Sequence, residues 1–439
     1  MLHHLPHRAR TALVRVLAEA RRRRACGPIV VGHHNRNHIL PLGLPLASLL
    51  GMGSGQVRAK FRVPLETVEV VPRIWRESEV LDVVSERLAG VPRCLADFGA
   101  WSLHAYVPGH ALSEEPPGTP VGEPRMEALA DFFAQLADIP PQALPRPADD
   151  WPHGDDSRAF LHRLARFTEQ QVHQVNRPRF GSLFDSVGIP ADLVSRFLRT
   201  VPDPVRRPFG LLHTDVHRAN IVVTQEPGDR DRLTVLDWEL SLYGDVLHDL
   251  ATHLVRMEYD PAERKLMTEL WAEAMRKAGR ADLTEGLDPD LGTYLGFEHV
   301  QSVFPDVMRA ALDLPAEPAP EDLGRSADRV RRALDRARGA LWMPGEPQDR
   351  PALVRALRRW HSEDRARQSS AHRAVRPGKG GAEACRDADR PRGADRSDGI
   401  RHWTRTWPPT LRREPQPGPD RERCAELVEP LEGLEPHGC

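Results

Sequence analysis

Long apolar stretches are missing from this 439-residue sequence. No run approaches the roughly 18 uninterrupted apolar residues that a membrane-spanning helix needs. The most apolar segment, residues 39–52, is interrupted by two prolines and two glycines. The arginine run at residues 21–24 follows a short apolar helix instead of preceding it, which is the wrong order for a secretion signal. We therefore expect neither a membrane span nor a signal peptide.

Cysteine is also scarce, with five residues scattered between positions 26 and 439 and no Cys-x-x-Cys pair. This spacing argues against a zinc ribbon and against a disulfide framework. A reducing compartment is then the default, and we predict a cytoplasmic protein.

An excess of either charge is the third absence, because 61 Lys+Arg balance 63 Asp+Glu for a formal charge of −2. A protein that binds nucleic acid usually carries a basic excess, so no nucleic-acid partner is expected. Lysine is itself rare, and Lys60 is the only lysine before residue 265.

What remains is an ordinary globular composition whose texture changes along the chain. Residues 1–24 contain one short amphipathic helix. In residues 25–110, apolar positions alternate with Arg and Lys over 57–63, and a helical pattern starts at Arg76, which together predict a small sheet with one helix.

Helical periodicity dominates residues 111–344, with one embedded β-hairpin made by residues 221–223 and 233–237. The predicted helices cover residues 123–138, 157–175, 190–200, 245–257, 261–279, 295–313 and 321–340. Residues 345–439 are dense in Arg, Pro, Asp and Gly, which predicts a disordered extension. The fold class is therefore α+β, with a small β-rich N-lobe, a larger mainly helical C-lobe and a disordered tail.

The segment LLHTDVHRANIVV, residues 211–223, carries the most chemical information. Asp215 precedes a strand, and Asn220 stands immediately before it. The returning strand of the hairpin delivers Asp237 beside Asn220. Oxygen ligands of this kind suit Mg²⁺, and a further carboxylate can accept a hydroxyl proton, which is the apparatus of phosphoryl transfer.

These residues resemble the aminoglycoside phosphotransferase / choline kinase family, which has a protein-kinase-like fold. The family's His-x-Asp-x-x-x-x-Asn loop is matched by His213, Asp215 and Asn220, and its Asp-Trp-Glu by residues 237–239. A later Gly-Asp-x-x-x-Asp-Leu-Ala is matched by residues 244–251. Upstream, Gly32 to Leu40 resembles the first hairpin, and residues 76–81 resemble the helix that carries a glutamate. The resemblance covers about residues 25–340.

The resemblance implies a role for each matched residue. Asp215, with His213 in the same catalytic loop, orients or deprotonates the acceptor hydroxyl. Mg²⁺ is held by Asn220 and Asp237, and Asp249 braces the loop. Nucleotide contacts fall to Asn35 or Asn37 in the first hairpin, to Glu77 through a strand cation, and to the linker that begins with Tyr106 and Val107. The cofactors are then Mg²⁺ and ATP, with GTP as an alternative.

The phosphate-contacting cation stays open between two residues. Lys60 and Arg62 alternate on the same strand face, so both side chains could reach the phosphates. There is also no Gly-x-Gly-x-x-Gly, because Gly51, Gly53 and Gly55 have another spacing. The polar turn GHHNRNH, residues 32–38, would cover the phosphates instead.

Two other functions compete with the small-molecule kinase. A metallohydrolase could use His213, Asp215 and His217 as metal ligands on one strand face, but it leaves Asn220 and Asp237 unexplained. A pseudokinase would bind nucleotide without turnover, although Asp215, Asn220 and Asp237 are all present.

The acceptor is expected to be a small molecule with a hydroxyl group. Acidic clusters in the helical part would suit a cationic acceptor such as an aminoglycoside. They comprise Glu114 with Glu115, Asp149 with Asp150, Asp155 with Asp156, and Asp282, Glu285, Asp288 and Asp290.

Overall fold

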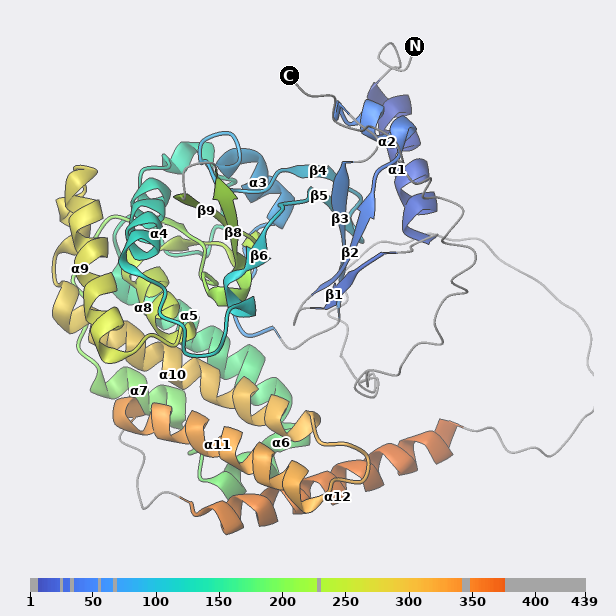
Figure 1. Cartoon of the computed structure of the whole chain (residues 1–439). Helices are drawn as coiled ribbons and strands as arrows, with labels where there is room; N and C mark the ends of the chain where they lie inside the picture. Colours follow the sequence, from blue (N-terminus) through green and yellow to red (C-terminus); the bar gives the residue numbers. More distant parts are fainter. Residues whose placement is uncertain are drawn as a thin grey trace, which may run out of the picture. The chain divides into compact units, whose positions relative to one another are not determined.

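The computed structural model describes residues 7–23, 27–31, 35–53, 57–65, 69–226, 230–341 and 348–375 (Figure 1). The chain folds as two compact units. Among the described residues, the first unit lies within 7–178, 189–306 and 332–341, and the second within 179–188, 307–331 and 348–375. Within the described ranges no helix is long and apolar enough to cross a membrane.

A five-stranded antiparallel sheet opens the first unit. Its spatial order is β1–β2–β3–β5–β4, with β1 Ile29–Val31, β2 Asn35–Pro41, β3 Arg58–Pro64, β4 Cys94–Asp97 and β5 Ser102–Ala105. Helices α1 (His7–Arg23) and α2 (Leu44–Leu49) contribute to the apolar core on one face of this sheet. The predicted helix from Arg76 is α3, Glu77–Val84.

Strand β3 shows why the sheet has one apolar and one polar face. Side chains alternate along a strand, so Ala59 and Phe61 enter the apolar core with Leu103 of β5. Lys60 and Arg62 take the opposite face. The two cations that the sequence could not separate therefore share one surface of the sheet.

Three short pairings lead from the sheet into the helical part. Residues 106–109 connect β5 to β6 (His110–Ala111), which pairs with β8 (Ile221–Glu226). β8 and β9 (Arg230–Val235) form the antiparallel hairpin that the sequence predicted, with Ile221 opposite Val235. β7 (Gly210–Leu212) pairs with β10 (Leu242–Gly244).

The bounds of the helices are α4 Glu123–Ala137, α5 Ser157–Phe167, α6 Val175–Val187, α7 Leu193–Thr200, α8 Val246–Arg256, α9 Pro261–Lys277, α10 Leu287–Leu312 and α11 Pro320–Leu341. All of them except α6 follow the predicted segments, whereas α6 begins at residue 175 and extends over residues for which no helix was predicted. The segment predicted as one helix over 157–175 is interrupted, because the π-helix η4 (Thr168–Gln174) separates α5 from α6. Aspartates cap several N-termini, and Asp260 with Glu263 forms a capping box at α9.

The predicted disordered extension from residue 345 is wrong for one stretch, since Arg350–Val375 forms α12 of the second unit. Although this helix is rich in arginine, it also carries a buried apolar stripe formed by Leu353, Leu357 and Trp360. The Trp360 ring stacks on Phe180 with 5.1 Å between centroids, and its Nε1 donates to the Arg179 carbonyl at 3.0 Å. Residues 376–439 lie outside the described residues.

Candidate active site

The loop of residues 213–220 connects β7 to β8, and residues outside the loop hold its conformation. The N–H groups of His213 and Thr214 donate to the two oxygens of Asp249 on α8, at 2.8 and 2.7 Å. Thr214 has a left-handed backbone with φ 61°, which is unusual for a β-branched residue. Its hydroxyl donates to the Leu240 carbonyl at 2.7 Å. These contacts specify the loop conformation from two other chain segments, α8 and the segment that contains Leu240.

His213 is fully buried, and both of its ring nitrogens contact backbone. Nε2 donates to the Leu236 carbonyl at 3.1 Å, and Nδ1 accepts from the Asp215 N–H at 3.2 Å. Burial lowers the pKa of His213 to about 4, so the ring is neutral at pH 7. A ring with both nitrogens engaged supports the loop and cannot also ligate a metal in this arrangement.

The metallohydrolase alternative loses its basis here, because it needs His213 as a ligand. The described part of the chain also holds no group of three or more His, Cys, Asp or Glu side chains placed to bind a metal ion.

Asp215 is buried, and other side chains contact both of its carboxylate oxygens. Oδ2 accepts from Asn220 Nδ2 at 2.9 Å, and Oδ1 accepts from Arg256 Nη1. His217 Nε2 lies 3.5 Å from Oδ1. Burial alone would raise the pKa of Asp215, but the charge of Arg256 and the hydrogen bond from His217 outweigh it and hold the pKa well below its usual range. The carboxylate is therefore ionised at neutral pH.

Asn220 and Asp237 meet because the hairpin returns beside its own start. The Leu236 N–H donates to the Asn220 carbonyl at 2.8 Å, which puts Asp237 one residue from that contact. Asn220 uses its amide nitrogen on Asp215 and keeps its amide oxygen as an acceptor. Asp237 has a left-handed backbone, φ 70°. An amide oxygen and a carboxylate are hard ligands that fit Mg²⁺.

Arg62 gathers three carboxylates around one guanidinium that is 3% exposed. Its Nε lies 3.0 Å from Glu77, and its Nη2 contacts Asp237 and lies 3.2 Å from Glu239. Burial works against this charge, yet the three carboxylates raise the pKa of Arg62. Glu77 also accepts from the Trp238 N–H at 3.1 Å, so α3 and the 237–239 segment are joined both directly and through Arg62.

The Lys60 side chain lies on the same face as that of Arg62 but makes no hydrogen bond or ion pair with any described residue. Its register partner across the sheet is His104 of β5. Burial, followed by repulsion from Arg62, lowers the pKa of Lys60. The structure thus pairs Arg62 with Glu77 and leaves the lysine as a separate cation beside this cluster.

Glu239 connects the sheet to this cluster as well. It accepts from Asn35 Nδ2 of β2 at 3.0 Å, and Arg73 Nη1 lies 3.4 Å from it. Asn35 is therefore close to the 237–239 segment. Residues 32–34 of the polar turn lie outside the described residues. Tyr106 and Val107 lie in the connection between β5 and β6 and are partly exposed.

Many carboxylates of the acidic clusters that favoured a cationic acceptor form ion pairs with arginines of the same chain. Members of all four clusters lie within 4 Å of an arginine, in the pairs Glu115–Arg125, Asp149–Arg146, Asp150–Arg163, Asp155–Arg206, Asp282–Arg280 and Asp290–Arg207. The acidic clusters therefore no longer favour a cationic acceptor over one of another charge.

Sequence reasoning missed Arg256 and Glu298, which no motif marks. Arg256 ends α8, and its Nε donates to Glu298 of α10 at 3.2 Å. The spacing along α8 could have indicated Arg256, because Asp249, His253 and Arg256 recur at helical intervals and so lie on one face. All three contact residues 213–216.

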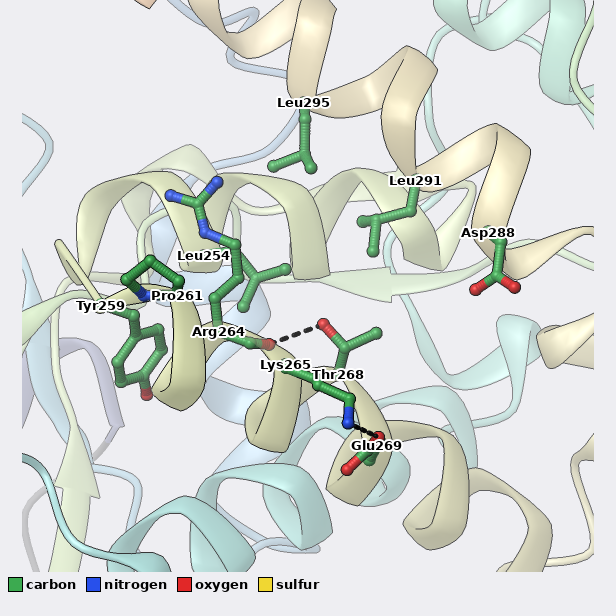
Figure 2. A pocket seen from close by; sticks show the side chains of 10 residues that line it. All are labelled: Leu254, Tyr259, Pro261, Arg264, Lys265, Thr268, Glu269, Asp288, Leu291 and Leu295. Carbon is green, nitrogen blue, oxygen red and sulfur yellow. Dashed lines mark hydrogen bonds and ion pairs between the residues drawn. The ribbon is translucent and has the colours of Figure 1, made fainter.

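A pocket of about 560 Å³ opens between α8, α9 and α10 (Figure 2). Leu254, Leu291 and Leu295 give it apolar walls, and Asp215 is not among its lining residues. Tyr259 lines it too, and its hydroxyl donates to His253 Nε2 at 3.1 Å. His253 Nδ1 in turn donates to the Val216 carbonyl at 2.9 Å, so the pocket wall is connected to the loop.

Comparison with known proteins matches residues 53–285 to the phosphotransferase enzyme family. A choline/ethanolamine kinase of Rattus norvegicus is 26% identical over 186 residues, which are 42% of this chain and 43% of the relative. The match thus spans less than half the length of that relative.

Comparison with solved structures finds two similar chains at lower identity. An ethanolamine kinase of Plasmodium vivax has 14% identity and a TM-score of 0.43, covering 71% of this chain and 81% of its own. A macrolide 2'-phosphotransferase type I has 17% identity and a TM-score of 0.42, covering 74% and 98%.

Proposed function

Because the chain belongs to the phosphotransferase enzyme family, we propose that it transfers the γ-phosphoryl group of ATP to a hydroxyl group of a small molecule. One observation carries this proposal: Asp215, Asn220 and Asp237 meet at one end of the β8–β9 hairpin, beside the Arg62–Glu77 ion pair. A carboxylate for the acceptor, oxygen ligands for a metal and cations for phosphate are the parts that phosphoryl transfer requires.

Asp215 receives the acceptor hydroxyl in this mechanism. Its low pKa makes it a weak base, so it orients the hydroxyl by accepting its hydrogen bond and takes the proton late. An orienting role for Asp215 suits phosphoryl transfer, in which positioning and electrostatic stabilisation supply most of the rate enhancement.

Asn220, through its amide oxygen, and Asp237, through its carboxylate, would hold Mg²⁺. When bound, Mg²⁺ supplies charge that offsets the phosphate oxygens. Asp237 contacts Arg62 in the structure, so the guanidinium also keeps this carboxylate ionised and ready to bind metal.

We assign the two cations of β3 different tasks. Arg62 is surrounded by Glu77, Asp237 and Glu239 and organises the site. Lys60, without an ion pair among the described residues, contacts the nucleotide phosphates. Lys60→Gln should then weaken Mg-ATP binding about tenfold or more while leaving adenosine binding unchanged, as measured by calorimetry; equal loss for both ligands would contradict the assignment.

Residues 25–110 would cover the nucleotide, with Tyr106 and Val107 beside the adenine, and residues 111–344 would hold the acceptor. The relatives are named for choline, ethanolamine and macrolides. An acceptor screen should therefore contain these compounds and aminoglycosides.

Thermal unfolding of the full chain with Mg-ATP or Mg-GTP tests the proposal first. A nucleotide at 100 times its dissociation constant should stabilise the fold by about 2.7 kcal/mol. Asp237→Asn should abolish this Mg-dependent gain. Asp231→Asn is the matched control, because Asp231 lies on the same hairpin but pairs with Arg125. A wild-type chain that neither nucleotide stabilises would refute the proposal, and stabilisation without phosphoryl transfer would leave a nucleotide-binding pseudokinase.

A further inference from the structure

One face of α8 contacts the catalytic loop at three successive points. Asp249 accepts from the backbone of residues 213 and 214, and His253 donates to the Val216 carbonyl. Arg256, seven residues after Asp249, differs from these two because it contacts the Asp215 side chain. The loop backbone is already fixed by the first two contacts, so Arg256 acts on the carboxylate itself.

Arg256 is in turn hydrogen-bonded to Glu298 of α10, through a guanidinium nitrogen other than the one that contacts Asp215. Its Nε donates to Glu298 at 3.2 Å, and Glu298 is 1% exposed. The other oxygen of Glu298 accepts from Gln301, one turn further along α10. A buried carboxylate that is itself hydrogen-bonded gives the guanidinium one defined position, which an exposed ion pair would not do.

We propose that Arg256 is a positioning residue that, anchored by Glu298, fixes the orientation of the Asp215 carboxylate toward the acceptor hydroxyl. This inference rests on the proposed kinase function. Asn220 restrains one oxygen of Asp215 and Arg256 restrains the other, so the carboxylate plane is set from both sides before the acceptor binds.

This arrangement predicts an effect on turnover that is separate from nucleotide binding. Arg256 contacts Asp215, whereas the cluster of Lys60, Arg62 and Glu77 lies on the sheet and α3. A displacement of a reacting group by about 1 Å can lower the rate about 10²-fold. Loss of Arg256 should therefore lower kcat and leave the KM for ATP nearly unchanged.

The experiment compares wild type with Arg256→Gln, Arg256→Lys and Glu298→Gln, using ADP release with the acceptor that the screen identifies and with water alone. Arg256→Gln should reduce kcat about 10- to 100-fold when kcat is normalised to the measured number of nucleotide-binding sites. Arg256→Lys should lie between, because one ammonium group cannot bridge Asp215 and Glu298 as a guanidinium does. Glu298→Gln should lower kcat in the same direction by a smaller factor.

Arg196→Gln is the matched control, since Arg196 pairs with Asp192 on the surface of α7 and should keep wild-type kcat. Added guanidinium ion should partly restore turnover to Arg256→Ala. A purely structural role would instead lower nucleotide-binding stoichiometry together with activity and show no rescue.

Wild-type kcat in Arg256→Gln, or a loss that follows stoichiometry alone, overturns the assignment of Arg256. If Arg256→Gln does not fold, Arg256→Lys and Glu298→Gln decide in the same way. Wild type that neither phosphorylates an acceptor nor hydrolyses ATP refutes the proposed function itself, and that result is distinguishable because it requires no variant.

Discussion

Replacing Gly109 by alanine should destabilise the connection between the five-stranded sheet and the β8–β9 hairpin. Gly109 precedes β6 and has φ +131°, a region that residues with a Cβ rarely adopt. A Cβ atom at this position would lie 2.2 Å from the Val223 carbonyl oxygen. Because that oxygen belongs to the backbone of β8, no side chain can rotate away to make room.

Two effects contribute to the expected magnitude. The backbone strain at a Gly-only conformation is about 1–3 kcal/mol. Real Cβ contacts essentially never fall below 3.0 Å, so β8 and the connection must separate by at least about 0.8 Å, and overpacking of this kind costs about 1–3 kcal/mol. Together they predict a loss of about 2–6 kcal/mol in the free energy of unfolding.

Gly118→Ala separates the two effects. Gly118 also has a positive φ, +81°, but a Cβ there would meet nothing within 4 Å. It should therefore lose only the strain, about 1–2 kcal/mol. Urea unfolding of both variants gives the comparison, and the reasoning fails if Gly109→Ala is destabilised no more than Gly118→Ala.

Three further perturbations test other parts of the molecule. Arg207 is fully buried between Asp245 and Asp290. Arg207→Met should lower the free energy of unfolding by about 3–5 kcal/mol, because two buried carboxylates lose their partner. Urea unfolding of this variant beside Arg196→Gln measures the loss, and equal losses in the two variants would contradict the prediction. His253 has a pKa lowered to about 4, mainly by burial, so it contributes stability above pH 6.5 that is lost as the pH falls toward 4. His253→Gln should accordingly lose less stability than wild type between pH 7 and pH 5, by about 2 kcal/mol, and identical pH dependence would rule this out. Trp360→Ala should remove about 3–5 kcal/mol from the second unit and reduce the helical circular dichroism of α12; an unchanged unfolding curve would show that α12 is not docked through Trp360.

The candidate site on the β8–β9 hairpin could be predicted because its residues lie close together in the sequence. His213, Asp215 and Asn220 lie within one loop, and a tight hairpin brings Asp237 back to it whatever the rest of the fold does. Alternation along residues 57–63 likewise placed Lys60 and Arg62 on one face, because side chains in a strand repeat every second residue.

Contacts between distant segments could not be predicted from the sequence. Arg62 and Glu77 are joined by an ion pair because α3 and β3 meet in the folded chain, and Asp237 reaches the same guanidinium from far along the sequence. The acidic clusters suggested a cationic acceptor only while their arginine partners were unknown.

Composition also misled where packing overrode it. The arginines of residues 350–375 suggested a disordered tail, yet one buried stripe with Trp360 against Phe180 is enough to hold a helix. By itself the sequence determined which residues are the candidate reacting groups, since they are spaced within one loop and its hairpin. Only the tertiary structure decided how those groups are held, because Arg256 and Glu298 come from two other helices and reach Asp215 through packing that no local pattern encodes.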